Sequence, residues 1–366
     1  MSVLKLQPAF KDYLWGGEKL VEKYGKRTTL RPVAESWELS YHPDGLTRLF
    51  DGRTLSGVLT PAELGENCGD FAVFPLLLKL IDAKEKLSVQ VHPSDAYALV
   101  HEKSLGKTEM WYIMDAEEGA GIYLGFRRDT TEEEYLAAIA DGSFLSLLNF
   151  FPVKKGEAYF IPAGTVHAIG AGCLICEIQQ NSNLTYRLYD YNRTDAMGKR
   201  RELHTEKALA VSDRRAYSAP RPLLSCGQER VLGISRYFHT TAITVVGRAV
   251  VSVDAASFRA LVCLSGEGSV GEVSVSAGDT VLLTAGSGEV TLTGTLTLLS
   301  VQVRRYTLTV EAREGSLYAI LTDDLGNLLA EEATPLLDGA EAEKRFLAER
   351  LLSSCGLSLD DVAEIR

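Results

Sequence analysis

Side chains of the kinds that bind divalent metals recur in short segments of the sequence. Residues 87–92, Leu-Ser-Val-Gln-Val-His, alternate apolar and polar types, which predicts a strand that projects Gln90 and His92 from one face. A second strand is predicted from Glu109 to Met114, and it begins with a carboxylate. Imidazole is a borderline ligand and carboxylate a hard one, so this combination suits zinc, iron or manganese.

A second histidine of this kind ends the segment Gly156-x5-Pro162-x-Gly164-x2-His167. Gly156 begins a turn, the following residues read as a strand, and Pro162 and Gly164 form a corner that directs His167 inward. A single inward histidine is more often a hydrogen-bonded core residue, and a single inward glutamate is more often in an ion pair. Because the four residues occur together, we predict a site for one divalent metal with the ligands Gln90, His92, Glu109 and His167.

Polar and aromatic residues follow this third segment. Residues 173–180 read as a strand, and Glu177 lies beside the metal if it faces inward. Residues 181–193 are dense in tyrosine and polar groups and include Tyr186 and Arg187. A pocket for a polyhydroxylated anion would use such hydroxyl donors and the fixed charge of Arg187, and a polar barrel rim is the alternative interpretation.

The elements that must position these residues are mostly short strands. From about residue 100 to Arg305, strand-like runs alternate with glycine-containing turns, as β-sandwiches and barrels require. Residues 130–141 read as a helix with a threonine cap and an acidic first turn, and residues 202–211 as another. We therefore predict a mainly β fold with few helices.

A break in this pattern and an internal repeat divide the chain. Residues 212–225 contain arginines and prolines without periodicity, which marks a domain boundary. An alternating β pattern returns at 242–253, 259–264, 270–275, 280–283, 289–292 and 297–303. The segment Gly278-Asp-Thr-Val-Leu-Leu-Thr-Ala-Gly parallels the one that begins at Gly156, but it has Glu289 where the first copy has His167. This predicts a second barrel without a metal.

The residues from 307 onward differ from both barrels. Strand-like runs at 317–322 and 328–332 flank Asp324-Leu-Gly-Asn327, a hairpin signal, and a helix is predicted from Ala340 to Ser353. This part resembles the opening hairpin and helix of sugar kinases of the actin-like ATPase class. Since the glycine-rich phosphate loop and the rest of a kinase are not recognisable, we expect no kinase activity. The predicted domains are 1–225, 226–306 and 307–366.

Several motifs over about residues 1–305 resemble the type I mannose-6-phosphate isomerases of the cupin superfamily. They are Leu14-Trp-Gly-Gly17, Trp37-Glu38, residues 74–83, Ser88-Val-Gln-Val-His-Pro93, Gly106-Lys-Thr-Glu109 and residues 177–182 through Arg187. The resemblance implies one zinc ion on the four ligands named above. Together with the pattern of elements it predicts two cupin (jelly-roll) barrels, and the residues from 307 onward add a small α+β extension at the C-terminus. This sequence has Gln90 where the superfamily usually has a histidine, and an insertion separates His92 from Glu109.

The resemblance also implies the reaction, which interconverts mannose 6-phosphate and fructose 6-phosphate, a phosphorylated hexose pair, through an enediol. Arg187 would stabilise the developing charge, and Glu177 is the candidate base, with a pKa that burial raises toward working pH. Lys107 and Lys79 are candidates to hold phosphate or a sugar oxygen. Trp15 and Tyr186 are candidate substrate contacts. A metal-dependent cupin oxygenase and a non-catalytic sugar-binding module are the alternatives.

Composition excludes other classes. A net charge of −11 at pH 7 disfavours binding to nucleic acid or to anionic lipid. Apolar runs are too short for a membrane span and the N-terminus lacks a secretory signal, so a cytoplasmic protein is expected. The 6 cysteines, Cys173, Cys176 and Cys226 among them, are interpreted as small buried residues rather than a zinc or redox site. The sequence leaves monomer and homodimer open.

Overall fold

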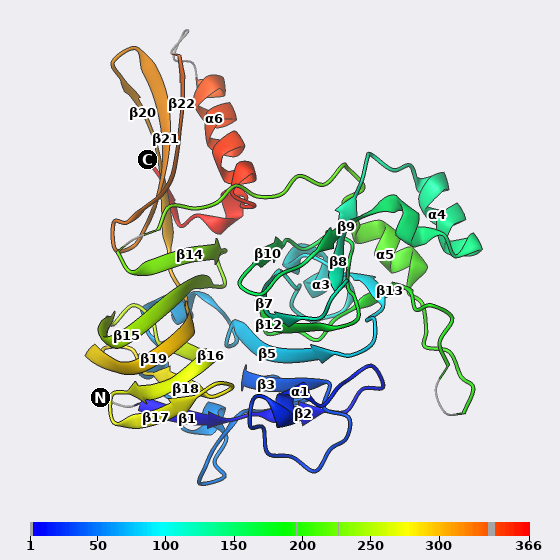
Figure 1. Ribbon diagram of the computed structural model, residues 1–366. Coiled ribbons are helices and arrows are strands. Elements are labelled where there is room, and N and C mark those ends of the chain that lie inside the picture. The colour runs from blue at the N-terminus through cyan, green and yellow to red at the C-terminus, as the bar shows by residue number, and fades with distance from the viewer. Residues whose placement is uncertain (1–2, 195–196, 226, 336–340) are drawn as a thin grey trace. The chain divides into compact units, whose positions relative to one another are not determined.

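The structure is a computed structural model that describes residues 3–194, 197–225, 227–335 and 341–366 (Figure 1). The predictions for Cys226 and Ala340 lie outside these residues. The chain divides into two compact units. The N-terminal barrel unit comprises Pro8–Thr47 and Leu76–Ser218, and the C-terminal barrel unit comprises the residues up to Gln7, Arg48–Pro75 and Ala219–Arg366. The division into three domains stays a prediction.

Two antiparallel sheets form the N-terminal barrel unit. The six-stranded sheet has the order β10-β7-β12-β5-β3-β2, and the five-stranded sheet has the order β13-β6-β11-β8-β9. The strands of the first are β2 (Ala9–Lys11), β3 (Glu35–Ser40), β5 (Leu76–Ala83), β7 (Glu109–Ala116), β10 (Ala158–Ile161) and β12 (Cys173–Gln180). Those of the second are β6 (Val89–Val91), β8 (Gly121–Phe126), β9 (Leu148–Pro152), β11 (His167–Ile169) and β13 (Tyr186–Tyr189). The predicted mainly β fold is confirmed.

Helices in this unit are short: α1 (Lys19–Glu22), α3 (Asp95–His101), α4 (Glu132–Asp141) and α5 (Thr205–Val211). The threonine cap predicted for α4 is Thr131, whose Oγ1 accepts a hydrogen bond from Glu134 N while the Glu134 carboxylate accepts one from Thr131 N. The helix ends at Gly142, which has a φ of 78°. In the described residues, no helix has both the length and the apolar character that a membrane span requires.

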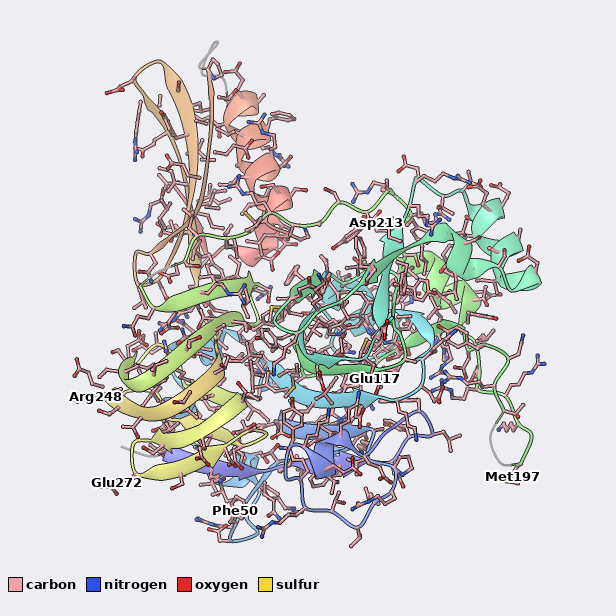
Figure 2. The ribbon with its side chains drawn as sticks, viewed as in Figure 1. Phe50, Glu117, Met197, Asp213, Arg248 and Glu272 are labelled. Carbon is pink, nitrogen blue, oxygen red and sulfur yellow. The ribbon has the colours of Figure 1, made fainter. Side chains whose placement is uncertain are left out.

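The C-terminal barrel unit contains an eight-stranded sheet. Its strands are β1 (Val3–Gln7), β4 (Arg48–Leu49), β14 (Glu229–Ile234), β15 (His239–Val253), β16 (Arg259–Val270), β17 (Val273–Ser276), β18 (Thr280–Leu283) and β19 (Gly288–Gln302), and a short helix, α2 (Pro61–Leu64), accompanies them. Valine, leucine and isoleucine side chains fill the interior. Arg248 projects outward from the middle of β15 (Figure 2).

The two runs predicted at 289–292 and 297–303 are wrong as separate strands, because β19 is continuous. Gly294, with a φ of 106°, lies in its middle and resembles a turn signal in the sequence. A Cβ at this position would lie 2.4 Å from the carbonyl oxygen of Glu267 on the neighbouring strand. The glycine therefore permits close approach of two strands rather than a turn.

The residues after Arg305 form a four-stranded sheet in the order β22-β21-β20-β23, with α6 (Glu341–Ser354) along one face (Figure 1). Its strands are β20 (Tyr306–Arg313), β21 (Ser316–Asp323), β22 (Leu328–Pro335) and β23 (Glu364–Ile365). The predicted hairpin and helix are confirmed, whereas β20 was not predicted. Leu321 and Leu351 share one apolar cluster with Val231 and Ile234 of β14. This segment is therefore packed on the C-terminal barrel through a common core.

Candidate metal centre

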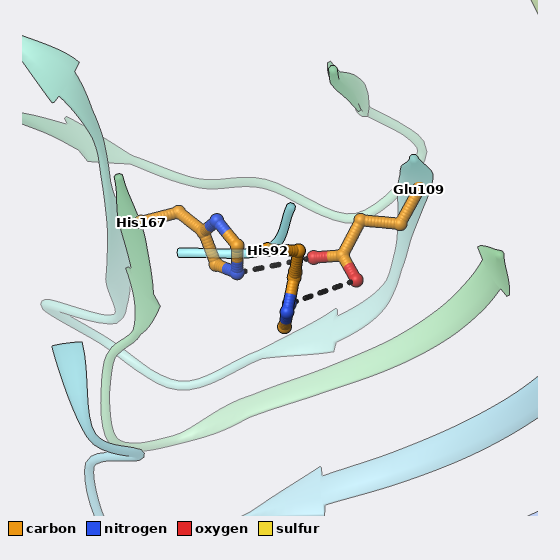
Figure 3. A group of neighbouring side chains, drawn as sticks. All are labelled: His92, Glu109 and His167. Carbon is orange, nitrogen blue, oxygen red and sulfur yellow. Dashed lines mark ion pairs between the residues drawn. The ribbon is translucent and has the colours of Figure 1, made fainter. Parts of the chain in front are cut away.

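Three predicted ligands converge inside the N-terminal barrel unit. His167 opens β11 and pairs with Gln90 of β6, Glu109 opens β7, and His92 follows β6 by one residue. One ligand atom from each of His92, Glu109 and His167 lies within 4.8 Å of the others. His167 Nε2 is 3.2 Å from Glu109 Oε1, and His92 Nε2 is 3.5 Å from Glu109 Oε2 (Figure 3).

Both histidines are oriented as metal ligands require. His92 Nδ1 lies 2.9 Å from the carbonyl oxygen of Leu184, and His167 Nδ1 lies 2.9 Å from that of Thr165. When Nδ1 donates a proton to these acceptors, the lone pair of each Nε2 faces Glu109. Burial lowers the pKa of His92 well below its ordinary value and that of His167 to about 4. Both rings are therefore neutral at neutral pH, as ligation requires.

The Glu109 carboxylate has an ion-pair partner, Lys107, at one oxygen, and its other oxygen faces His167. The side chain is fully buried, and no described residue donates a hydrogen bond to either oxygen, although Lys107 Nζ lies 2.7 Å from Oε2. Burial raises the pKa of Glu109 to about 7, against the opposing effect of Lys107. Buried carboxylates are normally paired, hydrogen-bonded or bound to metals. The donor set therefore fits a divalent cation.

Gln90 lies at the edge of the same cluster. Its amide nitrogen Nε2 is 3.3 Å from His167 Nε2, so the amide reaches the atom through which His167 would bind a metal. The amide group also has an oxygen, which is the atom that ligates cations. Gln90 as the fourth ligand stays a prediction with a position that supports it.

A row of alternating buried charges extends from the cluster. Lys107 Nζ lies 3.7 Å from Glu177 Oε1, Lys79 Nζ lies 3.4 Å from the same oxygen, and Glu35 Oε2 lies 3.8 Å from Lys79 Nζ. Lys79 and Glu177 face each other because they are register partners on β5 and β12. These side chains are at most 10% exposed, so their charges interact with little screening.

The expected direction of the Glu177 pKa is wrong. Burial raises this pKa, but the ammonium groups of Lys107 and Lys79, with a hydrogen bond from Trp111, outweigh burial and hold it below its ordinary value. The two lysines come from other segments of the chain, so their proximity could not be read from the sequence around Glu177. The carboxylate is consequently ionised at neutral pH and able to accept a proton.

Arg187 lies on the strand next to the ligands and pairs in register with Gln90. Its Nε is 3.3 Å from Ser88 Oγ, and its Nη1 donates to the carbonyl oxygen of Glu202 at 2.9 Å. Ser88 therefore shares the face of Arg187, as the alternation with Gln90 and His92 predicts. Burial, with the positive charge of Arg201, lowers the pKa of Arg187 from its ordinary value.

Two predicted substrate contacts lie elsewhere. Tyr186 precedes Arg187 on β13 and so points to the opposite face, where its hydroxyl donates to Glu102 Oε1 at 2.8 Å. Trp15 is 6% exposed and packs in the apolar cluster that includes Trp111. Their roles in substrate binding stay predictions, and these positions do not support that of Tyr186.

Other residues of the site were not singled out from the sequence: Glu35, Ser88 and Trp111. Alternation along residues 87–92 could have identified Ser88, because it shares a face with two ligands. Trp111 follows Glu109 by two residues on β7 and could have been found in the same way. Glu35 reaches Lys79 from β3, and its own segment carries no comparable signal.

The C-terminal barrel has a different residue at the position equivalent to Glu109. Ile161 and Leu283 occupy the same place in the two copies of the internal repeat. Ile161 pairs in register with Glu109, and Leu283 pairs in register with Arg259, so Arg259 stands where the first barrel has Glu109. Arg259 is 4% exposed, and its Nη1 lies 2.7 Å from Glu229 Oε1. A guanidinium cannot ligate a cation, and here it supplies a positive charge to the half-buried carboxylate of Glu229.

Comparisons with known proteins agree with this geometry. The family model for "Phosphomannose isomerase type I, catalytic domain" matches residues 3–120. The mannose-6-phosphate isomerase of Streptococcus mutans is 38% identical over 274 residues, which cover 73% of this chain and 86% of the relative. The chain belongs to the type I phosphomannose isomerase family.

Other members of the family agree in sequence and in fold. The mannose-6-phosphate isomerase ManA of Bacillus subtilis is 44% identical over 215 residues, covering 57% of this chain and 67% of the relative. The crystal structure of the mannose 6-phosphate isomerase from Bacillus subtilis matches with a TM-score of 0.74 at 33% identity, over 82% of this chain and 99% of that one. The type I phosphomannose isomerase fold is therefore present here, and this chain places the buried His92, Glu109 and His167 cluster within it.

Proposed function

We propose that this chain interconverts mannose 6-phosphate and fructose 6-phosphate, with zinc as its metal. One observation carries the proposal: in a chain of this family, His92, Glu109 and His167 converge beside a buried row of lysines and glutamates. A cytoplasmic location and action on a phosphorylated sugar without nucleic acid or membrane partners belong to the same proposal.

The metal would be held by His92, Glu109 and His167, with Gln90 as the fourth ligand. Two neutral imidazoles, one carboxylate and one amide oxygen suit zinc better than calcium or magnesium, which prefer oxygen ligands. When bound, zinc supplies a Lewis acid that polarises the carbonyl oxygen of the sugar.

Glu177 is the proposed base. Its Oε1 accepts no hydrogen bond from the described residues, and the carboxylate is ionised because its pKa is held low. In the forward direction Oε1 takes the proton from C2 of the open-chain aldose, and the electron pair of that bond forms the C1–C2 double bond of the enediol. Glu177 later returns the proton to C1, which completes the ketose.

Lys107 is the proposed group that moves the oxygen-bound protons. Its Nζ lies 3.7 Å from Glu177 Oε1 and 2.7 Å from Glu109 Oε2, between the base and the ligands. It would donate a proton to O1 as the enediol forms and recover one from O2 as the enediol collapses. The site is almost closed to water, since Lys107, Lys79 and Glu177 are each at most 4% exposed, which strengthens these interactions.

Arg187 and Lys79 are the proposed cations for the substrate. Arg187 is held by Ser88 and Glu202 on the strand beside Gln90, and a guanidinium binds phosphate or an enediolate oxygen with fixed geometry. The ammonium group of Lys79 offsets the negative charges of Glu177 and Glu35. It lies beside Glu177 Oε1, where it would donate a hydrogen bond to a sugar oxygen.

A coupled assay with mannose 6-phosphate, run on the full chain together with metal analysis of the same sample, tests the proposal. We expect activity in proportion to zinc content, its loss on chelation and its return with zinc. Glu177→Gln is the matched variant: it should keep zinc and lose at least about 100-fold in kcat. Activity that survives complete chelation, or oxygen consumption by the iron-loaded chain without isomerisation, would contradict the proposal.

A further inference from the structure

Trp111 contacts both parts of the proposed site. It lies on β7, two residues after Glu109, and is fully buried. Its indole Nε1 donates a hydrogen bond of 3.0 Å to Glu177 Oε2, and its ring meets the His167 ring edge-on, with centroids 5.3 Å apart at 84°. One side chain therefore touches the proposed base and a proposed metal ligand.

We propose that Trp111 is a positioning residue for the isomerisation: its N–H holds the plane of the Glu177 carboxylate so that the oxygen beside Lys79 and Lys107 accepts the carbon-bound proton, and its ring restrains His167. This inference rests on the proposed function of the site and goes beyond it by assigning a role to the indole.

The hydrogen bond orients the carboxylate of Glu177. The terminal torsion of a glutamate is broad and roughly two-fold, so rotation of the carboxylate costs little by itself. Both Lys79 and Lys107 lie beside Oε1, at 3.4 and 3.7 Å, and they would attract either oxygen equally. The two oxygens of an ionised carboxylate are chemically equivalent, so a flip by 180° restores the same arrangement. The indole N–H instead holds the orientation of the carboxylate plane, with one oxygen, Oε2, toward Trp111 and the other, Oε1, beside the lysines.

A purely apolar role does not account for this contact. Trp111 belongs to an apolar cluster with residues such as Ile113, Ile161 and Ile175, where phenylalanine would also fill space. The indole N–H, however, needs an acceptor when buried, and the acceptor here is an ionised carboxylate. A residue that only filled space would not need an N–H donor at this position.

Trp111→Phe tests the N–H while keeping an aromatic ring against His167. A hydrogen bond to a charged group is strong enough that its loss should lower kcat by about 10- to 100-fold. The KM for mannose 6-phosphate and the zinc content should stay within about twofold of wild type, because the ligands and Arg187 are untouched. Replacement of Trp111 by 3-benzothienylalanine, which has sulfur in place of the N–H, gives a second variant with nearly unchanged packing.

Tyr135→Phe is the matched control. It deletes a partly buried hydrogen bond of 3.0 Å, between Tyr135 Oη and Ser212 Oγ, from a fully buried aromatic residue in a different apolar cluster of the same unit. We expect a similar loss of thermal stability and no change in kcat.

Trp111→Ala should in addition weaken zinc affinity by about tenfold, measured by titration of the metal-free chain, because the ring no longer restrains His167.

Combination with Glu177→Gln separates a positioning role from general damage. If Trp111 acts through Glu177, the Trp111→Phe change should lower kcat in the wild-type background and have no further effect in the Glu177→Gln background. Equal losses in both backgrounds, or wild-type kcat in both N–H deletion variants, would overturn the inference. An inactive zinc-loaded wild type would instead refute the proposed function itself.

Discussion

Protonation of His239 should destabilise the C-terminal barrel unit in mild acid. The ring opens β15, is 4% exposed and stacks on Tyr306, with Nδ1 3.3 Å from the Tyr306 hydroxyl. Burial lowers the pKa of His239 from 6.5 to about 4, and the nearby charges of Asp323, Arg304, Glu229 and Arg259 offset one another in part. The ring is therefore neutral in the folded barrel.

The sign and size of the effect follow from this pKa. Between pH 6.5 and pH 4 the unfolded chain binds a proton at His239 that the folded chain does not, so stability falls as the pH falls. The shift corresponds to about 3 kcal/mol in full, of which about 2 kcal/mol is lost between pH 7.5 and pH 5. His239→Gln has no such proton to bind and should lack this component.

Pulsed hydrogen exchange during urea unfolding measures the effect, with peptides from β15 and β19 as reporters. These strands are needed because Trp15, Trp37 and Trp111 all lie in the N-terminal barrel unit, so tryptophan fluorescence does not report on the C-terminal one. Other groups titrate equally in wild type and His239→Gln, and their contributions cancel in the comparison. Equal losses of stability in both proteins between pH 7.5 and pH 5 would refute the reasoning.

Further predictions concern catalysis and stability. Arg187→Ala should lower kcat by about 100-fold and keep its zinc, as a coupled assay with metal analysis would show; near-normal turnover would remove Arg187 from the mechanism. Arg259→Met should lower the free energy of unfolding by about 2 kcal/mol because Glu229 loses its cation, and Glu229→Gln in the same chain should restore part of it in urea titrations. Leu351→Ala should lower the free energy of unfolding of the C-terminal barrel unit by about 3 kcal/mol and leave zinc binding unchanged. Hydrogen exchange of β14 measures this loss, and unchanged exchange there would show that α6 does not share a core with β14.

Local patterns in the sequence were sufficient to predict most of the His92, Glu109 and His167 cluster. Alternation places Gln90 and His92 on one face, and the Pro162 and Gly164 corner returns His167 to them. The same rule, applied to residues 186 and 187, would have placed Tyr186 on the opposite face from Arg187. The prediction of Tyr186 as a substrate contact came from reading the segment by composition rather than by period.

Features that depend on distant segments could not be predicted. The low pKa of Glu177 arises from Lys79 and Lys107, which other strands bring to it. The assignment of residues 3–7 and 48–75 to the C-terminal barrel unit depends on the pairing of β1 with β18, which no local signal specifies. In both cases the physical cause is a long-range contact, and a single sequence does not reveal such contacts.

Anomalous diffraction at the zinc edge, on crystals of the zinc-loaded chain, tests the central claim most directly. We predict one strong peak per chain, within bonding distance of His92 Nε2, His167 Nε2 and a carboxylate oxygen of Glu109, and its loss in Glu109→Ala. A peak elsewhere in the chain, or an equal peak in the Glu109→Ala protein, would contradict the claim.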